Sequence, residues 1–209
     1  MLLDPAQAAA FLLAAMAITV APGPDNLMVL SLGMARGRRA GMAFGLGCAA
    51  GCLSHTALAA IGLSAVIAAS ATAFTALKIV GGLYLMWLGV QAWRSRGTIR
   101  LAADAAAPRG LGALFAKGIV ANAVNPKVIL FFLAFLPQFV DAGRGDVGWQ
   151  TAQLGALFTV QGAVLFGAFG WFAGIVGQRL ARTPTAGVWL DRVAGSVFIL
   201  LGARLIAAR

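Results

Sequence analysis

Two short stretches decide how this chain folds: Ala21-Pro22-Gly23-Pro24-Asp25-Asn26 and, about half a chain later, Val124-Asn125-Pro126-Lys127. Each stretch interrupts an apolar segment long enough to cross a lipid bilayer, and each carries a charged side chain. Proline costs about 3 kcal/mol inside a helix and removes a backbone donor, so both stretches predict a break in a helix. Paired breaks at matching positions of two halves are typical of the substrate site of a membrane transporter.

The composition around these breaks is that of a membrane protein. Of the 209 residues, 61% are hydrophobic and only 11% are charged, whereas soluble domains contain about 25% charged residues. No Lys, Arg, Asp or Glu occurs between residues 40 and 77 or between residues 147 and 178. Because a spanning helix needs about 20 mostly apolar residues, several such helices fit into the chain.

The apolar segments predict an all-α, polytopic membrane protein of six transmembrane helices, folded as a single domain over residues 1–209. The first and the fourth helix are the broken ones. The predicted spans are residues 8–34 (broken near 22–25), 41–64, 73–93, 112–139 (broken near 125), 150–176 and 187–207.

The two halves of the chain resemble each other beyond their breaks. Glycines seven residues apart recur in the third span, at Gly82 and Gly89, and in the sixth, at Gly195 and Gly202. Because each half holds three spans, an odd number, the second half must be inverted relative to the first. We therefore predict a 3+3 inverted repeat, an arrangement that places a substrate site near the midplane, where the halves meet.

The formal net charge of +10 comes largely from arginine clusters between the apolar spans. The clusters are Arg36, Arg38 and Arg39; Arg94, Arg96, Arg100 and Arg109; and Arg179, Arg182 and Arg192. They follow the first, third and fifth spans, as the positive-inside rule describes for cytoplasmic loops. This predicts both termini outside the cytoplasm and a cytoplasmic linker over about residues 95–110, between repeat halves of about 5–95 and 110–208. A nucleic-acid partner is not expected, since it would need one basic surface in water.

Asp25 and Lys127 are the charges predicted to lie deepest in the membrane. A charge at the bilayer centre costs about 2.5–3.5 kcal/mol on insertion scales, so such a side chain faces protein or water. If helices restart at both breaks, their free N–H groups and dipoles favour an anion there. Lys127 adds a positive charge and Asp25 can face an ammonium group, so the site suits a zwitterion such as an amino acid. The predicted substrate-binding residues are Gly23, Pro24, Asp25, Asn26, Asn122, Asn125, Pro126, Lys127 and Gln161.

Several of these residues also have a structural interpretation. Asp25 and Lys127 could form a mutual ion pair, and Asp25 could cap the helix that follows it. Asn125 before Pro126 is a favourable N-cap with proline at the first helical position. His55 is the single histidine; it could simply bond a neighbour, or it could carry a proton, because histidine titrates near neutral pH. Asp25 and His55 are therefore the candidates for proton coupling.

The two motifs resemble those of the LysE/RhtB family of amino-acid exporters. Pro22-Gly23-Pro24-Asp25 follows the first apolar run, and Asn125-Pro126-Lys127 is followed by Phe131-Phe132-Leu133 and Leu136-Pro137-Gln138-Phe139. The length, the number of spans and the Gly-rich second span fit too, so the resemblance covers nearly the whole chain. It implies an exporter of amino acids or their derivatives in the bacterial inner membrane, driven by the proton gradient. Protons, membrane lipid and the cargo are the implied partners, with neither enzymatic activity nor a cofactor.

Other function classes compete with export. A passive amino-acid facilitator could use the same site without protons. A membrane thiol-redox carrier would need a cysteine in each repeat, whereas Cys48 and Cys52 both lie in the second span. Metal efflux would need several His, Cys or carboxylate ligands, and no metal site is predicted. The Gly-rich faces of the second and fifth spans fit packing within the chain or a homodimer equally well.

Overall fold

The computed structural model describes residues 3–21, 23–69, 71–95, 110–175 and 184–207. Every regular element in this part of the chain is a helix, as the sequence predicts. Outside it lie Pro22 of the first motif, the interior of the predicted linker, and five arginines of the basic clusters, Arg96, Arg100, Arg109, Arg179 and Arg182.

The first and fourth predicted spans are broken where the proline motifs stand. α1 (Pro5–Val20) and α2 (Pro24–Arg36) meet at an angle of 58°. α5 (Leu111–Ala123) meets the helical segment Pro126–Phe139, which begins with α6 (Pro126–Leu130), at 50°. Both predicted breaks are therefore present.

Proline and asparagine start the second part of each broken helix. Pro24 and Pro126 occupy the first helical positions, where the missing N–H has no intrahelical partner in any case. The side chain of Asn125 accepts a hydrogen bond from the backbone N–H of Lys127 at 3.0 Å, which confirms the predicted N-cap. The N-cap of α2 is Gly23 and Asp25 lies within the first turn. The interpretation of Asp25 as a cap is therefore wrong, because the helix already begins one residue before it.

The chain does not stay α-helical after the second break, which the sequence did not predict. A π-helical turn, η1 (Phe131–Phe135), and a 3-10 turn, η2 (Leu136–Phe139), follow α6. Pro137 lacks the N–H that would continue an α-helical ladder. The π turn directs Phe131, Phe132 and Phe135 into the protein, where each is at most 1% exposed. π turns occur frequently at functional sites.

Four longer helices complete the described fold: α3 (Arg38–Ala69), α4 (Ala71–Arg94), α7 (Val147–Trp171) and α9 (Pro184–Ala207). Within the described residues, two helices are long and apolar enough to cross a membrane, residues 38–62 of α3 and all of α7. Each broken pair passes the same test if it counts as one span, which raises the number to four. α4 and α9 have 24 residues each, so each is about 36 Å long.

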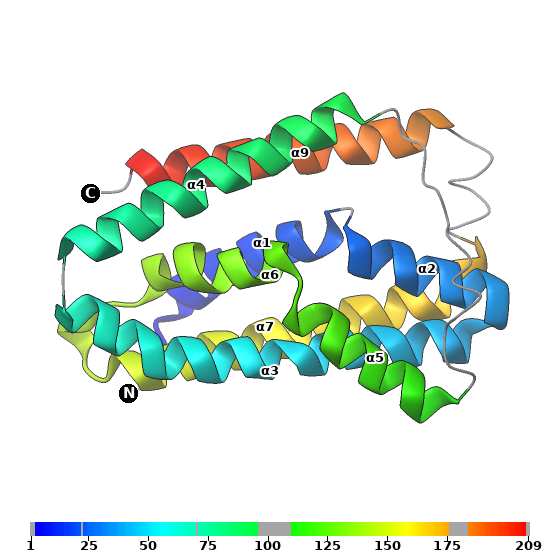
Figure 1. The fold of residues 1–209 in the computed structure, drawn as a ribbon, viewed down its shortest axis with the longest axis horizontal. Helices are drawn as coiled ribbons and strands as arrows, with labels where there is room; N and C mark the ends of the chain where they lie inside the picture. The colour runs from blue at the N-terminus through cyan, green and yellow to red at the C-terminus, as the bar shows by residue number, and fades with distance from the viewer. Residues whose placement is uncertain (1–2, 22, 70, 96–109, 176–183, 208–209) are drawn as a thin grey trace.

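The helices lie in layers (Figure 1). α4 and α9 run side by side along one edge, and α3, α5 and α7 lie along the opposite edge. The broken elements α1, α2 and α6 lie between them. The start of α1 and the end of α9 are at one end of the molecule, and the turn between α2 and α3 is at the other. Both breaks therefore lie in the interior, between the two edges.

The Gly-rich face of α3 serves packing within the chain. A Cβ atom added to Gly41, Gly45, Gly47 or Gly51 would meet an atom of another helix within 3 Å. Helices in lipid associate through such close backbone approach. Gly167 of α7 has open space at the same position, with nothing within 4 Å. The alternative of packing within the chain is therefore the one observed for the predicted second span.

α4 and α9 cross with glycine facing glycine. A Cβ added to Gly82 would lie 2.8 Å from the carbonyl oxygen of Gly202, and one added to Gly89 would lie 2.6 Å from that of Gly195. The reverse contacts are equally close, at 2.5 Å from Gly202 to the Gly82 oxygen and 2.6 Å from Gly195 to the Gly89 oxygen. The four glycines that recur at seven-residue spacing are thus the residues at which the backbones of α4 and α9 approach each other.

We expect Gly89→Leu to destabilise the protein by about 1–3 kcal/mol or to prevent its folding, because the new side chain would overlap a backbone carbonyl. The melting temperature in detergent and the yield of monodisperse protein measure this effect. Gly167→Leu is the matched control, since its side chain would enter open space. Equal stability of the two variants would contradict the close crossing of α4 and α9.

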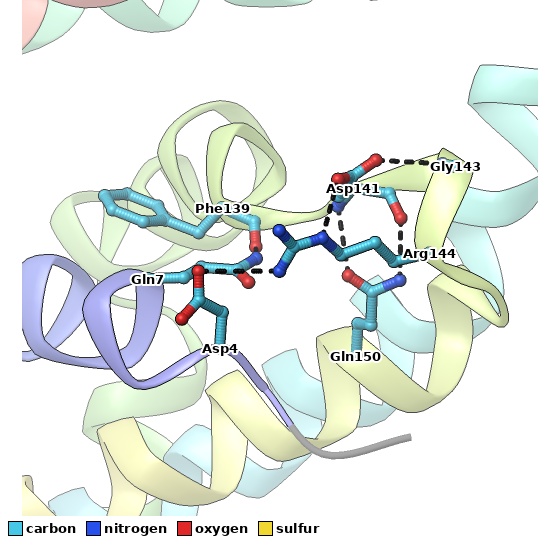
Figure 2. Close-up of polar contacts among 7 residues, drawn as sticks. All are labelled: Asp4, Gln7, Phe139, Asp141, Gly143, Arg144 and Gln150. Carbon is cyan, nitrogen blue, oxygen red and sulfur yellow. Dashed lines mark hydrogen bonds and ion pairs between the residues drawn. The ribbon is translucent and has the colours of Figure 1, made fainter.

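Figure 2 shows the polar contacts that hold the start of α1 against the segment after the second break. The guanidinium of Arg144, in η3 (Ala142–Arg144), lies 3.2 Å from Asp141 and 3.5 Å from Asp4. Gln7 donates to the last backbone carbonyl of η2, and Gln150 exchanges hydrogen bonds of 2.8 and 3.0 Å with the backbone of Asp141. Each exposed ion pair contributes at most about 1 kcal/mol. Together these contacts nevertheless hold the start of α1 beside η2 and η3.

Candidate functional site

The end of α1 is capped by side chains from the other segments of the two breaks. The amide Nδ2 of Asn26 donates to the backbone carbonyl of Thr19 at 2.8 Å. The ammonium of Lys127 donates to the backbone carbonyls of Ile18 and Ala21, at 3.1 Å each. Carbonyls in the last turn of a helix have no intrahelical partner, so these contacts satisfy groups that would otherwise be left unpaired.

Asn122, in the last turn of α5, links that turn to α2 and α3. Asn122 is 1% exposed, and its amide Nδ2 donates to a carboxylate oxygen of Asp25 at 3.0 Å. The ring nitrogen Nε2 of His55 lies 3.1 Å from the backbone carbonyl of Asn122. The thiol of Cys52 donates to the side-chain oxygen of Asn122 at 3.4 Å. One residue thus connects the carboxylate, the histidine and a cysteine.

The two breaks contact each other in a crossed pattern. Asp25 is the second residue of α2 and bonds the last turn of α5, whereas Lys127 is the second residue of α6 and bonds the last turn of α1. Asp25 is 3% and Lys127 8% exposed. Among the residues that the structure describes, no direct ion pair joins them. The mutual ion pair considered from the sequence is therefore not what holds them in place.

A cavity lies where the breaks meet. The empty space measures about 300 Å³, including the part that opens to solvent. Ligand pockets in proteins combine apolar walls with a few polar groups. The enclosed part of this cavity is much smaller, about 20 Å³, which is room for a water molecule. Its walls consist of Ile18, Thr19, Asp25, Cys52, Asn122, Lys127, Val128, Phe131, Phe158 and Phe166. One carboxylate, one ammonium and one amide thus face a small, otherwise mostly apolar space.

Three buried polar atoms have no hydrogen-bond partner among the described residues: Oδ1 of Asn26, Nδ2 of Asn125 and Oε1 of Gln161, on residues that neighbour or bond the cavity wall without lining it. Gln161 comes from α7, and its Nε2 donates to the hydroxyl of Thr19 at 2.9 Å. An unpaired buried polar group costs about 1–3 kcal/mol. Such atoms therefore favour a polar ligand or water that can pair with them.

The structure brings most of the predicted site residues together. Asp25, Asn122 and Lys127 line the cavity, and Gly23 lies so near that an added Cβ would be 2.8 Å from the ammonium of Lys127. Asn125 caps α6 next to Pro126, and Asn26 lies in the first turn of α2, two residues after Pro24. Gln161 and His55 do not line the cavity: Gln161 bonds the hydroxyl of Thr19, and His55 lies beside the backbone carbonyl of Asn122. Their role in substrate binding stays a prediction.

Neither the apolar residues of the cavity wall nor the polar residue Thr19 could be recognised from the sequence. Thr19 stands among apolar residues before the first motif, and no signal in the sequence distinguishes it from a packing residue. The apolar wall could not be separated from the rest of a hydrophobic chain. Cys52 lines the cavity as well, although its spacing from Cys48 fits a small packing residue. Both cysteines are free thiols.

The chain is similar to known translocators over nearly its whole length. The LysE type translocator family matches residues 16–209. An uncharacterised membrane protein of Vibrio cholerae is 35% identical over 203 residues, 96% of either chain. A homoserine/homoserine lactone efflux protein of Salmonella typhimurium is 32% identical over 203 residues, again 96% of either chain. A threonine efflux protein of Escherichia coli is 32% identical over 218 residues, 95% of this chain and 98% of the relative.

The relatives are membrane proteins and efflux proteins by name, and the matched family is one of translocators. No solved structure matches the chain. The protein belongs to the LysE type translocator family. This confirms the resemblance carried by the two proline motifs.

Proposed function

We propose that the protein exports amino acids or amino-acid derivatives across the bacterial inner membrane, as a multi-pass protein driven by the proton gradient. The observation that carries the proposal is the cavity between the two helix breaks, with the carboxylate of Asp25 and the ammonium of Lys127 in its wall. The names of two relatives, a threonine efflux protein and a homoserine/homoserine lactone efflux protein, support this class of cargo. The cargo is moved without chemical change.

In this proposal the cavity, whose enclosed part is too small for an amino acid in this structure, widens to bind the cargo as a zwitterion. Asp25 accepts one hydrogen bond from Asn122 through Oδ2, which leaves Oδ1 for the ammonium group of an amino acid. Lys127 uses two of its three donors on backbone carbonyls, which leaves one for the carboxylate. The unpaired amide of Asn125 is a further donor beside the start of α6, where the helix dipole favours an anion.

The proposed architecture is six transmembrane helices in a 3+3 inverted repeat. The crossed pattern at the breaks supports it, since corresponding positions of the two restarted helices contact the opposite half. The glycine contacts support it too. In the repeat, Gly82 corresponds to Gly195 and Gly89 to Gly202. In the structure Gly82 meets Gly202 and Gly89 meets Gly195, so the first glycine of one half meets the second glycine of the other. A two-fold axis between α4 and α9 generates this pattern.

The proposed orientation puts the basic helix ends in the cytoplasm. α2 ends at Arg36, α3 begins at Arg38 and α4 ends at Arg94. These helix ends are drawn at one end of the molecule in Figure 1, opposite the start of α1 and the end of α9. The positive-inside rule then places the start of α1 and the end of α9 on the outer side.

Proton coupling is proposed at Asp25 and His55. The two residues are linked by Asn122, whose side chain bonds Asp25 and whose backbone carbonyl lies 3.1 Å from the ring of His55. Protonation of Asp25 would remove the charge that holds the cargo's ammonium group. Binding of a proton and binding of the cargo would then exclude each other, as an antiporter requires.

Growth protection tests the proposed export directly. Cells that overproduce the protein should tolerate inhibitory amounts of its cargo better than cells that lack it, in a panel that includes threonine, homoserine, homoserine lactone and dipeptides. We expect protection from one compound or a few related ones. Protection from none of the amino acids or derivatives would contradict the proposal.

Vesicles distinguish antiport from the alternative, a passive facilitator. With the membrane potential held at zero, an antiporter should take up protons as the cargo moves in the opposite direction. A passive facilitator would equilibrate the cargo without any proton flux. Cargo flux without proton movement would therefore replace the coupled mechanism by the passive one.

A further inference from the structure

The last turn of α1 directs backbone carbonyls into the first break. Asn26 pairs with the carbonyl of Thr19 at 2.8 Å and with that of Val20 at 3.4 Å, and the carbonyl of Ala17 accepts the N–H of Ala21 within the helix, at 3.0 Å. The carbonyls of Ile18 and Ala21 remain, and both converge on one point. The C-terminal end of a helix carries about half a negative elementary charge, so this point favours a cation.

The group found there is the ammonium of Lys127, bonded to both carbonyls at 3.1 Å. These are ordinary N–H···O distances. The fit is close, since a Cβ added to Gly23 would lie 2.8 Å from Nζ. Lys127 belongs to α6, on the other break, and its stem is buried. The buried Oδ1 of Asn26 is an additional unpartnered oxygen on α2.

We propose that the end of α1 is a binding site for a monovalent cation, and that the ammonium of Lys127 occupies it as a tethered ion. In transporters with broken helices, the carbonyls of an unwound segment and the ends of half-helices coordinate a free coupling ion. Here a side chain of the opposite break takes the place of that ion. Lys127 is thus a positioning residue that ties the two breaks together, and the protein needs no free cation at this position.

This inference goes beyond the proposed export and does not depend on it. A lysine that contacts only the cargo would leave the end of α1 unaffected when truncated. A lysine that fills a cation site would leave behind two unpaired carbonyls and a negative helix end, which a small free cation with N–H donors can occupy. The two roles therefore differ in what truncation does to the protein without cargo.

The test measures the thermal stability of purified Lys127→Ala in detergent, without cargo, in ammonium chloride and in choline chloride of equal ionic strength. Choline has no N–H donor and is too large for the space beside Gly23. We expect about 100 mM ammonium to raise the melting temperature of the variant by about 3 °C or more relative to choline. The unchanged protein and the control Lys117→Ala, on α5 outside the cavity, should show no such difference.

An equal response of Lys127→Ala and the unchanged protein, or no response of the variant, would overturn the proposal. If Lys127→Ala does not survive extraction in choline, the extraction is repeated in ammonium with Lys127→Met, which keeps the length of the stem. Recovery in ammonium alone supports the cation site. Loss of the Met variant in both salts overturns it, because free ammonium should then replace the missing group.

Discussion

Asp25→Asn should leave the protein folded and inserted but reduce export by at least about a hundredfold, a loss of about 2.7 kcal/mol. Asparagine has the size of aspartate, and its side-chain oxygen can still accept the hydrogen bond from Asn122. What the substitution removes is the negative charge that we propose for the cargo's ammonium group and for the proton. Efflux of the cargo from loaded cells, at equal amounts of protein in the membrane, measures the effect.

Asp191→Asn is the matched control for this experiment. Asp191 is also a buried carboxylate, 9% exposed, but it lies on α9 and does not line the cavity. We expect this variant to retain export. Unchanged efflux by Asp25→Asn would show that the lone carboxylate at the first break has no part in transport. Loss of efflux by both variants at equal abundance would mean that export requires buried carboxylates in general and not specifically the one at the first break.

Lys127→Ala should weaken the apparent affinity for an amino acid far more than that for the matching carboxamide. The ammonium can give a charge-assisted hydrogen bond to a carboxylate, which contributes about 1.5–3 kcal/mol, or about tenfold to a hundredfold in affinity. A neutral carboxamide receives less from the same donor. Competition of both compounds for transport in vesicles measures the ratio. An equal loss for the two compounds would contradict a contact between Lys127 and the cargo's carboxylate.

The double variant Asp25→Asn with Lys127→Gln separates ligands from a compensating charge pair. If the two residues only neutralise each other, removing both charges should restore part of the activity lost in either single variant. If they hold the two charges of the cargo, the double variant stays inactive. The separate partners of Asp25 and Lys127 in the structure lead us to expect the second result. Transport by vesicles that contain the double variant would show that neither residue is a ligand of the cargo.

The broken helices could be predicted because their signals are local. Proline excludes itself from a helix interior wherever it stands, and Asn125 caps the helix that starts at Pro126 through contacts two residues away. The long uncharged stretches likewise predict apolar helices from composition alone. The π turn at Phe131–Phe135 was not predicted, because the phenylalanines have the same hydrophobic pattern in an α-helix. What goes with the wider π turn is the burial of these phenylalanines against other helices, and their helix propensity does not indicate it.

The sequence by itself determined where the helices break, which charges stand at the breaks, and which glycines recur in both halves. Only the tertiary structure decided what these residues contact. Lys127 bonds carbonyls 106 and 109 residues away, and Asn122 bonds a carboxylate 97 residues away. Carbonyls exist at every residue and carry no signature in the sequence. The partner of a buried charge therefore depends on which helix end the fold brings beside it, and that depends on the packing of the whole chain.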